Sequence, residues 1–267
     1  MFLTLKSVIR DALPRRYQVP LKFWYNKLRD DLEDEMALLP ELLKPSDTVI
    51  DIGANRGVYA YSLARIGARV ELFEPNPACA QILASWAAPR PNVNLHRVAL
   101  SDHEGSAQLQ IPVDEAGVEH DSSASIERSD SGQFREHVVP FATLDSFQFP
   151  QVALIKIDVE GHELSVVKGA QKTIASNKPA LLIEIERRHV NHPFSSTFNL
   201  LQDEGYRSFF FDAMILRPID EFDVDRDQRL GDLGIHNSRY INNFLFLHET
   251  HLGNGGYAQL FHRWGQR

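Results

Sequence analysis

The segment Thr48–Gly57, TVIDIGANRG, constrains the fold more than any other part of this sequence. Its first half, Thr48–Ile52, is mostly apolar and β-branched, which predicts a strand that is buried on both faces. Gly53 and Gly57 then bracket a tight turn, and the apolar pattern of Val58–Ile66 predicts a helix. Such a turn lets a ligand approach the backbone closely, because glycine has no Cβ and the first helical N–H groups are unpaired. The segment therefore predicts a ligand site in an α/β fold.

The turn differs from the commoner nucleotide-binding loops. The residue two positions after Gly53 is Asn55, whose side chain would crowd the pyrophosphate that a G-x-G-x-x-G loop binds. No Gly-Lys-Ser/Thr triplet follows, so a triphosphate-binding loop is also absent. Two acids are present instead, Asp51 in the strand and Glu74 after the next apolar run, Val70–Phe73. Two carboxylates suit a cationic ligand that carries a ribose diol.

In these features the sequence resembles the class I S-adenosylmethionine-dependent methyltransferases, and more specifically their FkbM family. The resemblance covers about residues 47–248 and rests on DIGANRG and on three later motifs: ALSD at 99–102, TLD at 143–145 and, above all, KIDVEGHE at 156–163. It implies that S-adenosylmethionine is the cofactor. The residues expected to hold it are Asp51, Gly53, Ala54, Asn55, Gly57, Glu74, Pro75, Asn76, Ser101, Asp102 and Asp158. Glu74 would bind the ribose and Asp102 would lie near the adenine, although Ser101 and Asp102 could instead cap a helix.

Strands and helices alternate along most of the chain, which predicts a parallel sheet with right-handed crossovers and a ligand at the carboxyl ends of the strands. We expect strands at 48–53, 69–73, 93–98, 152–157, 180–185 and 206–211, and helices at 57–66, 77–87, 161–175 and from Ser195 or Ser196, as the cap, to Gly205. The resemblance implies a Rossmann-like α/β fold: a mostly parallel seven-stranded sheet with helices on both faces and an antiparallel last strand, 242–248. We also expect an extra strand at 105–112, a mobile loop at 114–136 that closes over the acceptor, a short strand at 138–141 and an irregular segment at 218–239.

The length of 267 residues suits one sizeable domain with additions at both ends. We expect an N-terminal helical extension or lid at 1–45, the methyltransferase domain at 46–249 and a C-terminal tail at 250–267. Residues 19–43 read as one helix that carries an apolar stripe of Leu28, Leu32, Met36 and Leu39.

Aromatic side chains gather just before that stripe, at Phe23, Trp24 and Tyr25. They could stack on a sugar or cover the cofactor. Ordinary packing of the helix onto the sheet is the alternative.

Charge and cysteine content exclude several classes of protein. The formal net charge of −8 leaves no basic footprint for nucleic acid. The single cysteine, Cys79, cannot form an internal disulfide, so we expect a buried thiol in a cytoplasmic protein. Lys6 and Arg10 interrupt the apolar N-terminus too early for a membrane span. Its helical spacing permits contact with a membrane surface, or docking on the domain itself or on a second subunit.

Catalysis should take place beyond the fourth core strand, where Asp158, Glu160 and His162 follow one another closely. Methyl transfer to a hydroxyl needs a base, and we favour Asp158 or Glu160, with His162 as a rival because its usual pKa is near neutrality. Glu160 could instead stabilise the following helix N-terminus, as could Glu163. Lys156, in the middle of an apolar strand, needs a partner, and Asp158 lies on the same face.

Glu184, Glu186 and His189 follow the adjacent strand and are candidates for binding the acceptor. Together with Asp158 they could bind a divalent cation, but no spacing here is diagnostic of a metal site and we expect none.

These residues predict an S-adenosylmethionine-dependent O-methyltransferase, and the family resemblance implies a sugar hydroxyl, in a glycan or a glycosylated metabolite, as the acceptor. An N-methyltransferase of a small molecule or peptide fits the same loop. A non-catalytic binding module would keep the fold but lose the loop acids, and these are intact. A nicotinamide-dependent dehydrogenase is disfavoured by Asn55.

Overall fold

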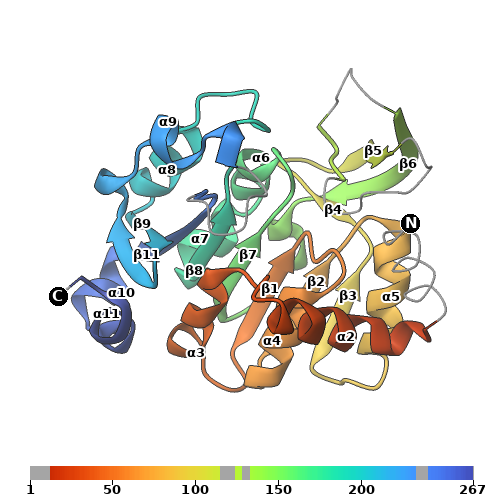
Figure 1. Ribbon diagram of the computed structural model, residues 1–267, viewed down its shortest axis with the longest axis horizontal. Helices are drawn as coiled ribbons and strands as arrows, with labels where there is room; N and C mark the ends of the chain where they lie inside the picture. Colours follow the sequence, from red (N-terminus) through yellow and green to blue (C-terminus); the bar gives the residue numbers. More distant parts are fainter. Residues whose placement is uncertain (1–12, 115–123, 128–132, 233–239, 267) are drawn as a thin grey trace.

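A computed structural model of the chain describes residues 13–114, 124–127, 133–232 and 240–266 (Figure 1). An eight-stranded sheet forms its centre, in the order β10-β9-β11-β8-β7-β1-β2-β3. These strands are β1 Thr48–Ile52, β2 Arg69–Phe73, β3 Val93–His96, β7 Val152–Ile157, β8 Ala180–Glu184, β9 Tyr206–Asp212, β10 Ile215–Pro218 and β11 Asn243–His248. The run from β8 to β3 is parallel, whereas β11 is antiparallel to both of its neighbours. The expected α/β fold with an antiparallel last strand is confirmed.

The strand β10 is the departure from the expected seven. It pairs antiparallel with β9, and Ala213 and Met214 connect the two strands with positive φ angles of 49° and 62°. Two consecutive left-handed residues make the tight turn whose twist matches that of paired strands. The turn lacks the usual glycine or asparagine, so no turn motif indicates this edge strand.

Helices cover both faces of the sheet, as expected. One face carries α2 Arg15–Leu28, η1 Asp34–Leu38, α3 Leu39–Leu42, α4 Val58–Ile66, α5 Pro77–Ala87 and α11 Ala258–Trp264, and the other carries α6 Glu163–Lys168, α7 Gln171–Asn177 and α8 Ser196–Asp203. This division follows from right-handed crossovers, because the chain moves from β1 toward β3 in one direction and from β7 toward β8 in the other.

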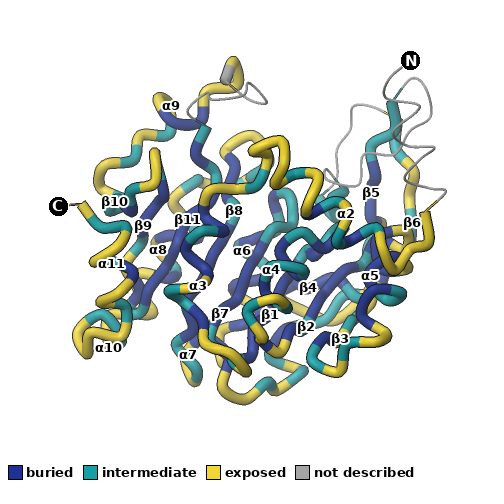
Figure 2. Tube along the Cα trace, turned by 60° about the horizontal axis from the view of Figure 1, so that its bottom comes forward, coloured by how far each residue is buried: buried dark blue, intermediate teal, exposed yellow. Residues whose placement is uncertain are grey.

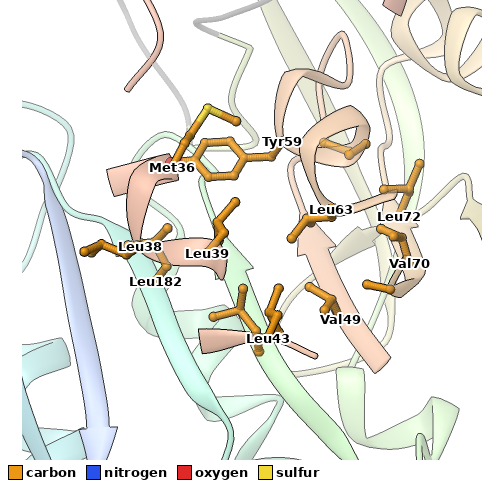
Figure 3. Close-up of a cluster of buried hydrophobic side chains, with 14 of the residues drawn as sticks. Met36, Leu38, Leu39, Leu43, Val49, Tyr59, Leu63, Val70, Leu72 and Leu182 are labelled. Carbon is orange, nitrogen blue, oxygen red and sulfur yellow. The ribbon is translucent and has the colours of Figure 1, made fainter. Parts of the chain in front are cut away.

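The core is split by the sheet into two apolar layers. Val49 packs with the α4 side and Ile50 with the α6 side, since successive strand residues point to opposite faces. The central strands are accordingly buried almost throughout, while the helices combine buried, intermediate and exposed residues (Figure 2). On the α4 side, η1 and α3 place Met36 and Leu39 close to Tyr59 and Leu63 of α4 (Figure 3).

The single helix expected over 19–43 is wrong. Helix α2 ends at Leu28, Asp30 takes a left-handed conformation with φ of 58°, and the chain resumes as η1 and α3. The stripe is therefore not continuous, because Leu28 is exposed whereas Met36 and Leu39 are buried.

Two other expected helices also differ. The helix expected over 161–175 is divided at Gly169 and Ala170 into α6 and α7. Ser195 precedes α8, but its side chain makes no capping hydrogen bond.

A smaller sheet of three strands, in the order β4-β6-β5, stands beside the main one. Its strands are β4 Ala99–Leu100, β5 Gly105–Val113 and β6 Gln133–Ala142. The extra strand at 105–112 is confirmed. The short strand expected at 138–141 is longer, because β6 pairs with β5 along the whole length of β5. Most of the predicted loop 114–136 lies outside the described residues, which include 124–127.

The segments after β10 are more regular than expected. They contain η4 Ile219–Glu221, α9 Val224–Asp227 and η5 Leu230–Asp232, and the tail forms α10 Glu249–Gly253 and α11. Phe261 and Trp264 of α11 contact Phe209 and Phe211 of β9, so part of the predicted tail packs on the sheet. Among the described residues, no helix combines the length and apolar character needed to cross a membrane. The N-terminal residues 1–12, with their apolar spacing, lie outside the described chain.

Candidate active site

Four polar side chains lie in a row across the sheet at the carboxyl ends of its central parallel strands. They are Asp51 of β1, Lys156 of β7, Glu184 of β8 and Asn243 at the start of the antiparallel β11. Asp51 is paired with Lys156, and Glu184 with Asn243, in the strand register. Each of the four lies two positions along its strand from a residue that packs on the α4 side, so all four point to that face. A polar row here must find its partners within the protein, because the face is covered.

Lys156 and Asp158 form the predicted ion pair. The Lys156 Nζ lies 3.1 Å from Asp158 Oδ2 and 4.9 Å from the centre of the Tyr59 ring, and the lysine is only 1% exposed. Burial alone would lower the pKa of Lys156, but the carboxylates of Asp158, Glu33, Glu184 and Asp51 outweigh it and raise the pKa. The lysine therefore stays charged and holds the Asp158 carboxylate in place.

Asp51 is the acid with the least satisfied side chain in this row. It is 2% exposed, and its Oδ2 atom is buried without a hydrogen-bond partner among the described residues. Burial raises its pKa to about 7; the Lys156 charge opposes this shift, and Asp158 adds to it. A buried acceptor without a donor is costly, so this oxygen is suited to a cationic donor supplied by a ligand.

Glu74 closes the glycine loop onto the end of β2. Its two carboxylate oxygens accept hydrogen bonds from the backbone N–H groups of Asn55, at 2.6 Å, and Asn76, at 2.7 Å. Asn76 in turn caps α5 by accepting the N–H of Ala78 at 3.0 Å. The second predicted acid thus shapes the loop, and it also lines a cavity next to Pro75.

The two loop glycines are required by packing within the protein. Both have φ of 78°, which favours glycine. A Cβ on Gly53 would lie 1.8 Å from the Asp158 carbonyl oxygen, and one on Gly57 would lie 2.8 Å from Leu83 of α5 and 3.1 Å from Val19 of α2. We expected the missing Cβ atoms to leave room for a ligand. This expectation is wrong, because atoms of the protein itself occupy the space where each Cβ would lie. What they allow is close contact between the β1 loop, the end of β7 and the helices.

The N-terminal segment contributes residues that the sequence patterns did not single out. Tyr59 of α4 donates a hydrogen bond to Glu33 Oε2 at 2.6 Å, and Asn243 Nδ2 donates to the same oxygen at 3.2 Å. Burial raises the pKa of the neighbouring Glu35 to about 8. Both glutamates belong to a cluster of acids at 30–35, and such a cluster is also typical of the solvent-facing side of a helix.

The aromatic cluster of α2 faces away from this site. Phe23 is buried against Tyr61 of α4, with ring centres 4.8 Å apart, and the Trp24 indole N–H donates to the Tyr61 hydroxyl. The α2 residues that do line a cavity beside Asp51 are Lys22 and Asn26. Packing on the domain therefore accounts for Phe23, while Trp24 and Tyr25 stay largely exposed.

Glu160 occupies a strained turn beyond β7. It has φ of 52°, and Gly161 follows with φ of 102°, where a Cβ would lie 2.5 Å from the His189 carbonyl oxygen. Glu160 Oε2 lies 2.6 Å from His189 Nδ1. Burial raises the pKa of Glu160. Burial would lower the pKa of the His189 imidazole, but the Glu160 carboxylate outweighs burial and raises that pKa. Glu163 is buried and accepts the Gly161 N–H at 2.9 Å, so its role at the helix start is structural.

His162 points to the other side of the same turn. Its Nδ1 lies 2.6 Å from Glu127 Oε1 and its Nε2 lies 2.9 Å from Ser101 Oγ. Ser125 completes this connection, because its hydroxyl donates to the Glu160 carbonyl at 2.8 Å. The described segment 124–127 is thereby attached to the end of β4. Asp102 is more exposed, and its carboxylate pairs with His103 at 2.5 Å.

Two cavities meet at this edge of the sheet. The first, the Glu74 cavity, is lined by Phe73, Glu74, Pro75, Leu100, Ile126 and His162 among others, and the second, the Asp51 cavity, by Lys22, Asn26, Glu33, Asp51, Tyr59, Lys156 and Glu184. Gly53, Asn55, Asp158 and Glu160 line both. The strand ends thus form a continuous lining around the first glycine turn, with the Lys156–Asp158 pair at the junction.

The predicted acceptor residues are divided between different surroundings. Glu184 lines the Asp51 cavity and accepts a hydrogen bond from Asn242 at 2.6 Å, and burial followed by the Asp158 charge raises its pKa well above the usual value. Glu186 lines neither cavity; it pairs with Arg188 and accepts from Tyr240 at 3.1 Å. Over the described part of the chain, no group of three or more histidine, cysteine or acidic side chains is placed to hold a metal ion.

Comparison with known proteins identifies the family of this chain. The profile of the methyltransferase FkbM domain matches residues 51–208, which is more than half of the sequence. The chain belongs to the FkbM methyltransferase family. The matched FkbM region begins at Asp51 and includes Glu74, Asp158 and Glu184, but it leaves out Glu33 and all of α2. The N-terminal wall of the Asp51 cavity thus lies outside the matched region.

Individual relatives match more distantly. The chain is 30% identical to the hexuronic acid methyltransferase AglP of Haloferax volcanii over 146 residues, which cover 54% of this chain and 58% of AglP. It is 35% identical to the ribosomal RNA small subunit methyltransferase A of Thermotoga neapolitana over 83 residues, which cover 30% of this chain and 32% of that protein. A crystal structure of the FkbM methyltransferase of Methylobacillus flagellatus is 17% identical, with a TM-score of 0.48, and the match covers 76% of this chain and 44% of that one.

Proposed function

We propose that this FkbM protein is an S-adenosylmethionine-dependent O-methyltransferase that acts on a sugar hydroxyl. The observation that carries the proposal is the Asp51 Oδ2 atom, a buried carboxylate oxygen without a donor, beside a junction formed by Asp158 and Gly53. S-adenosylmethionine, when bound, supplies an electrophilic methyl group on a positively charged sulfur. Asp51 would hold its ammonium group, Glu74 its ribose, and the residues around Leu100 and Ile126 its base.

Asp158 is the proposed base. It lines both cavities, and its carboxylate is 3.1 Å from the Lys156 ammonium group, which fixes its position. As the acceptor oxygen takes the methyl group, its proton passes to the Asp158 carboxylate. Glu160 would orient the acceptor, since it also lines both cavities and is itself held by His189. His162 lines only the Glu74 cavity, which supports a role on the cofactor side.

The walls of the Asp51 cavity support a polyhydroxylated acceptor. Six acids and three bases line it: Asp31, Glu33, Asp51, Asp158, Glu160 and Glu184 against Lys22, Arg56 and Lys156. Carboxylates accept hydrogen bonds from sugar hydroxyls and repel an acidic acceptor. We therefore propose a neutral or amino sugar as the acceptor, in contrast to the hexuronic acid of AglP, and the net charge of −8 argues against nucleic acid.

The variant Asp158→Asn tests the base. We expect methyl transfer to a neutral glycoside to fall by roughly 10²–10⁴-fold, because the amide cannot take the proton. The measurement is transfer of a labelled methyl group from S-adenosylmethionine, across pH, with hexosides and the corresponding uronates as acceptors. Glu160→Gln is the matched control, and we expect a smaller loss with an unchanged pH profile.

S-adenosylhomocysteine titration and thermal unfolding of Asp158→Asn separate a chemical defect from misfolding. Normal binding with lost transfer supports the assignment. Transfer that is unaffected by Asp158→Asn, in a variant that binds normally, would rule out Asp158 as the base. A preference for uronates would overturn the acceptor class alone.

A further inference from the structure

Helix α2 presents an exposed apolar stripe that the proposed chemistry does not use. Tyr17, Leu21, Trp24 and Leu28 follow one another at intervals of four, three and four residues, so they share one side of the helix. All four are exposed, and Leu28 is 85% exposed. Of the nine large hydrophobic side chains that are exposed in the described chain, six lie within residues 13–28. Scattered exposed apolar residues are normal, but a contiguous stripe indicates an interaction surface.

The opposite side of α2 is already occupied. Val19 and Phe23 are the buried residues of this helix, and they contact α4 and α5, on whose outer side α2 lies (Figure 1). The α2 stripe, which we define as Tyr17, Leu21, Trp24 and Leu28, lies away from these buried contacts, although the Trp24 indole N–H donates to the Tyr61 hydroxyl at 3.3 Å.

Cationic side chains flank the α2 stripe on one side. Helix α2 contains Arg15, Arg16, Lys22 and Lys27 and no acid, in a protein whose net charge is −8. At 100° per residue, Arg16 and Lys27 lie along one border of the stripe, whereas Arg15 and Lys22 lie toward the opposite side of the helix. The Arg16 guanidinium is 4.7 Å from the Tyr17 ring centre and the Lys27 Nζ is 5.2 Å from the Trp24 ring centre.

We propose that the α2 stripe docks this protein on an anionic lipid surface. Aromatic and leucine side chains flanked by lysine and arginine are what an interfacial helix needs, because the rings and aliphatic groups enter the headgroup boundary while the cations pair with lipid phosphates. A second copy of this chain would bring like charges together along the same flank. The helix that docks also provides Lys22 and Asn26 to the Asp51 cavity, from the side that faces away from the stripe.

Vesicle sedimentation of the full chain tests the proposal. At about 0.15 M NaCl, we expect binding to vesicles of equal parts phosphatidylcholine and phosphatidylglycerol and little binding to pure phosphatidylcholine. The double variant Leu21→Ser/Leu28→Ser should bind at least fivefold more weakly. The double variant Arg16→Gln/Lys27→Gln should bind roughly 25-fold more weakly, about fivefold for each lost cation. The matched control is Val138→Ser, which removes a side chain that is 75% exposed on β6 and should leave binding unchanged.

Trp24 provides an independent signal, since Trp86 is fully buried and Trp264 is half-buried against Phe211 of β9. Tryptophan emission should shift to shorter wavelength with the anionic vesicles, and Trp24→Phe should lose most of the shift. Three results would each overturn the proposal: equal binding to both vesicle types or to neither, stripe variants that bind as well as the unmodified chain, or a dimer in sedimentation velocity that Leu21→Ser/Leu28→Ser dissociates without any vesicle binding. Circular dichroism and thermal unfolding verify that each variant is folded.

Discussion

At the scale of single residues, the site is dominated by acids that the protein keeps away from water. Asp51, Glu163 and Glu35 all have raised pKa values because they are buried. They differ in their surroundings. Among the described residues, Glu163 Oε2 and Asp51 Oδ2 are both buried without a donor, but Glu163 accepts a backbone N–H with its other oxygen and lines neither cavity, whereas Asp51 lines one. The same chemical group is thus structural in one place and available to a ligand in the other.

This difference predicts a pH dependence of cofactor binding. Burial raises the pKa of Asp51 to about 7, so the ionised form that attracts an ammonium group becomes populated as the pH rises through that value. We expect the affinity for S-adenosylhomocysteine, measured by calorimetry, to increase several-fold from about pH 6 to about pH 7.5. Asp51→Asn should weaken binding and abolish the increase.

Glu163→Gln is the matched control for that measurement. Burial also raises the pKa of Glu163 to about 7, but Glu163 does not line either cavity. The variant should keep the increase. Affinity that is flat with pH in the unmodified protein would contradict the role given to Asp51.

Residue patterns in the sequence were sufficient to predict part of this site. Asp51, Glu74, Lys156 and Asp158 could be selected because each is a polar group inside or just after an apolar strand, and the Lys156–Asp158 pair followed from strand alternation. Tyr59 could not, because a tyrosine on the apolar side of a helix looks like core until the position of Glu33 is known. The hydrogen bond from its hydroxyl to Glu33 depends on the fold, which brings these two residues together.

At the scale of elements, the turn between β1 and α4 is fixed by its contact with the end of β7. Gly53→Ala would place a Cβ 1.8 Å from the Asp158 carbonyl oxygen in a left-handed conformation. We expect a loss of at least about 3 kcal/mol in the free energy of unfolding, since both the clash and the strain must be relieved.

Gly231→Ala is the comparison, because nothing lies within 4 Å of the added Cβ there. Its effect should stay within about 0.5 kcal/mol. Urea unfolding of both variants gives the two values. Equal stability would mean that the loop does not depend on this contact.

Several element boundaries next to glycine or proline were predicted well, although the division at Gly169 was missed. The strand Arg69–Phe73 and the helix Pro77–Ala87 match their predicted limits. The break after Leu28 carries no such mark, because Asp30 supplies the left-handed conformation instead. Apolar spacing that continued across the break made two elements look like one helix.

At the scale of the whole molecule, the fold brings together groups that are distant in sequence. Glu33 and Asn243 are hydrogen-bonded although they are 210 residues apart. The strand order accounts for this, since β11 returns between β8 and β9 and places its first residue at the edge where the parallel strands end. A sequence pattern is local. The pattern could indicate the strands and the family resemblance could indicate the sheet, but neither could show which N-terminal acid covers the strand ends.

The buried acids also set the stability of the whole chain without cofactor. Burial raises the pKa of Asp51 and Glu163 to about 7 and that of Glu35 to about 8, so between about pH 5 and pH 8 the folded state binds more protons than the unfolded state. We expect the free energy of unfolding to decrease by several kcal/mol across this range as the pH rises. Carboxyl groups with lowered pKa values, such as Glu127, act only at lower pH.

Urea titrations at several pH values measure this slope. Glu35→Gln should reduce it, because one of the three groups is removed. Stability that increases from pH 5 to pH 8 would show that these acids are not buried as described.

The account depends most on where the methyl donor binds, and a crystal structure with S-adenosylhomocysteine measures this directly. We predict the adenosine in the Glu74 cavity, the amino group within hydrogen-bond distance of Asp51 Oδ2, and the sulfur directed toward Asp158. A ligand bound elsewhere, or a cavity beside Asp51 that stays filled by the protein's own side chains, would contradict it.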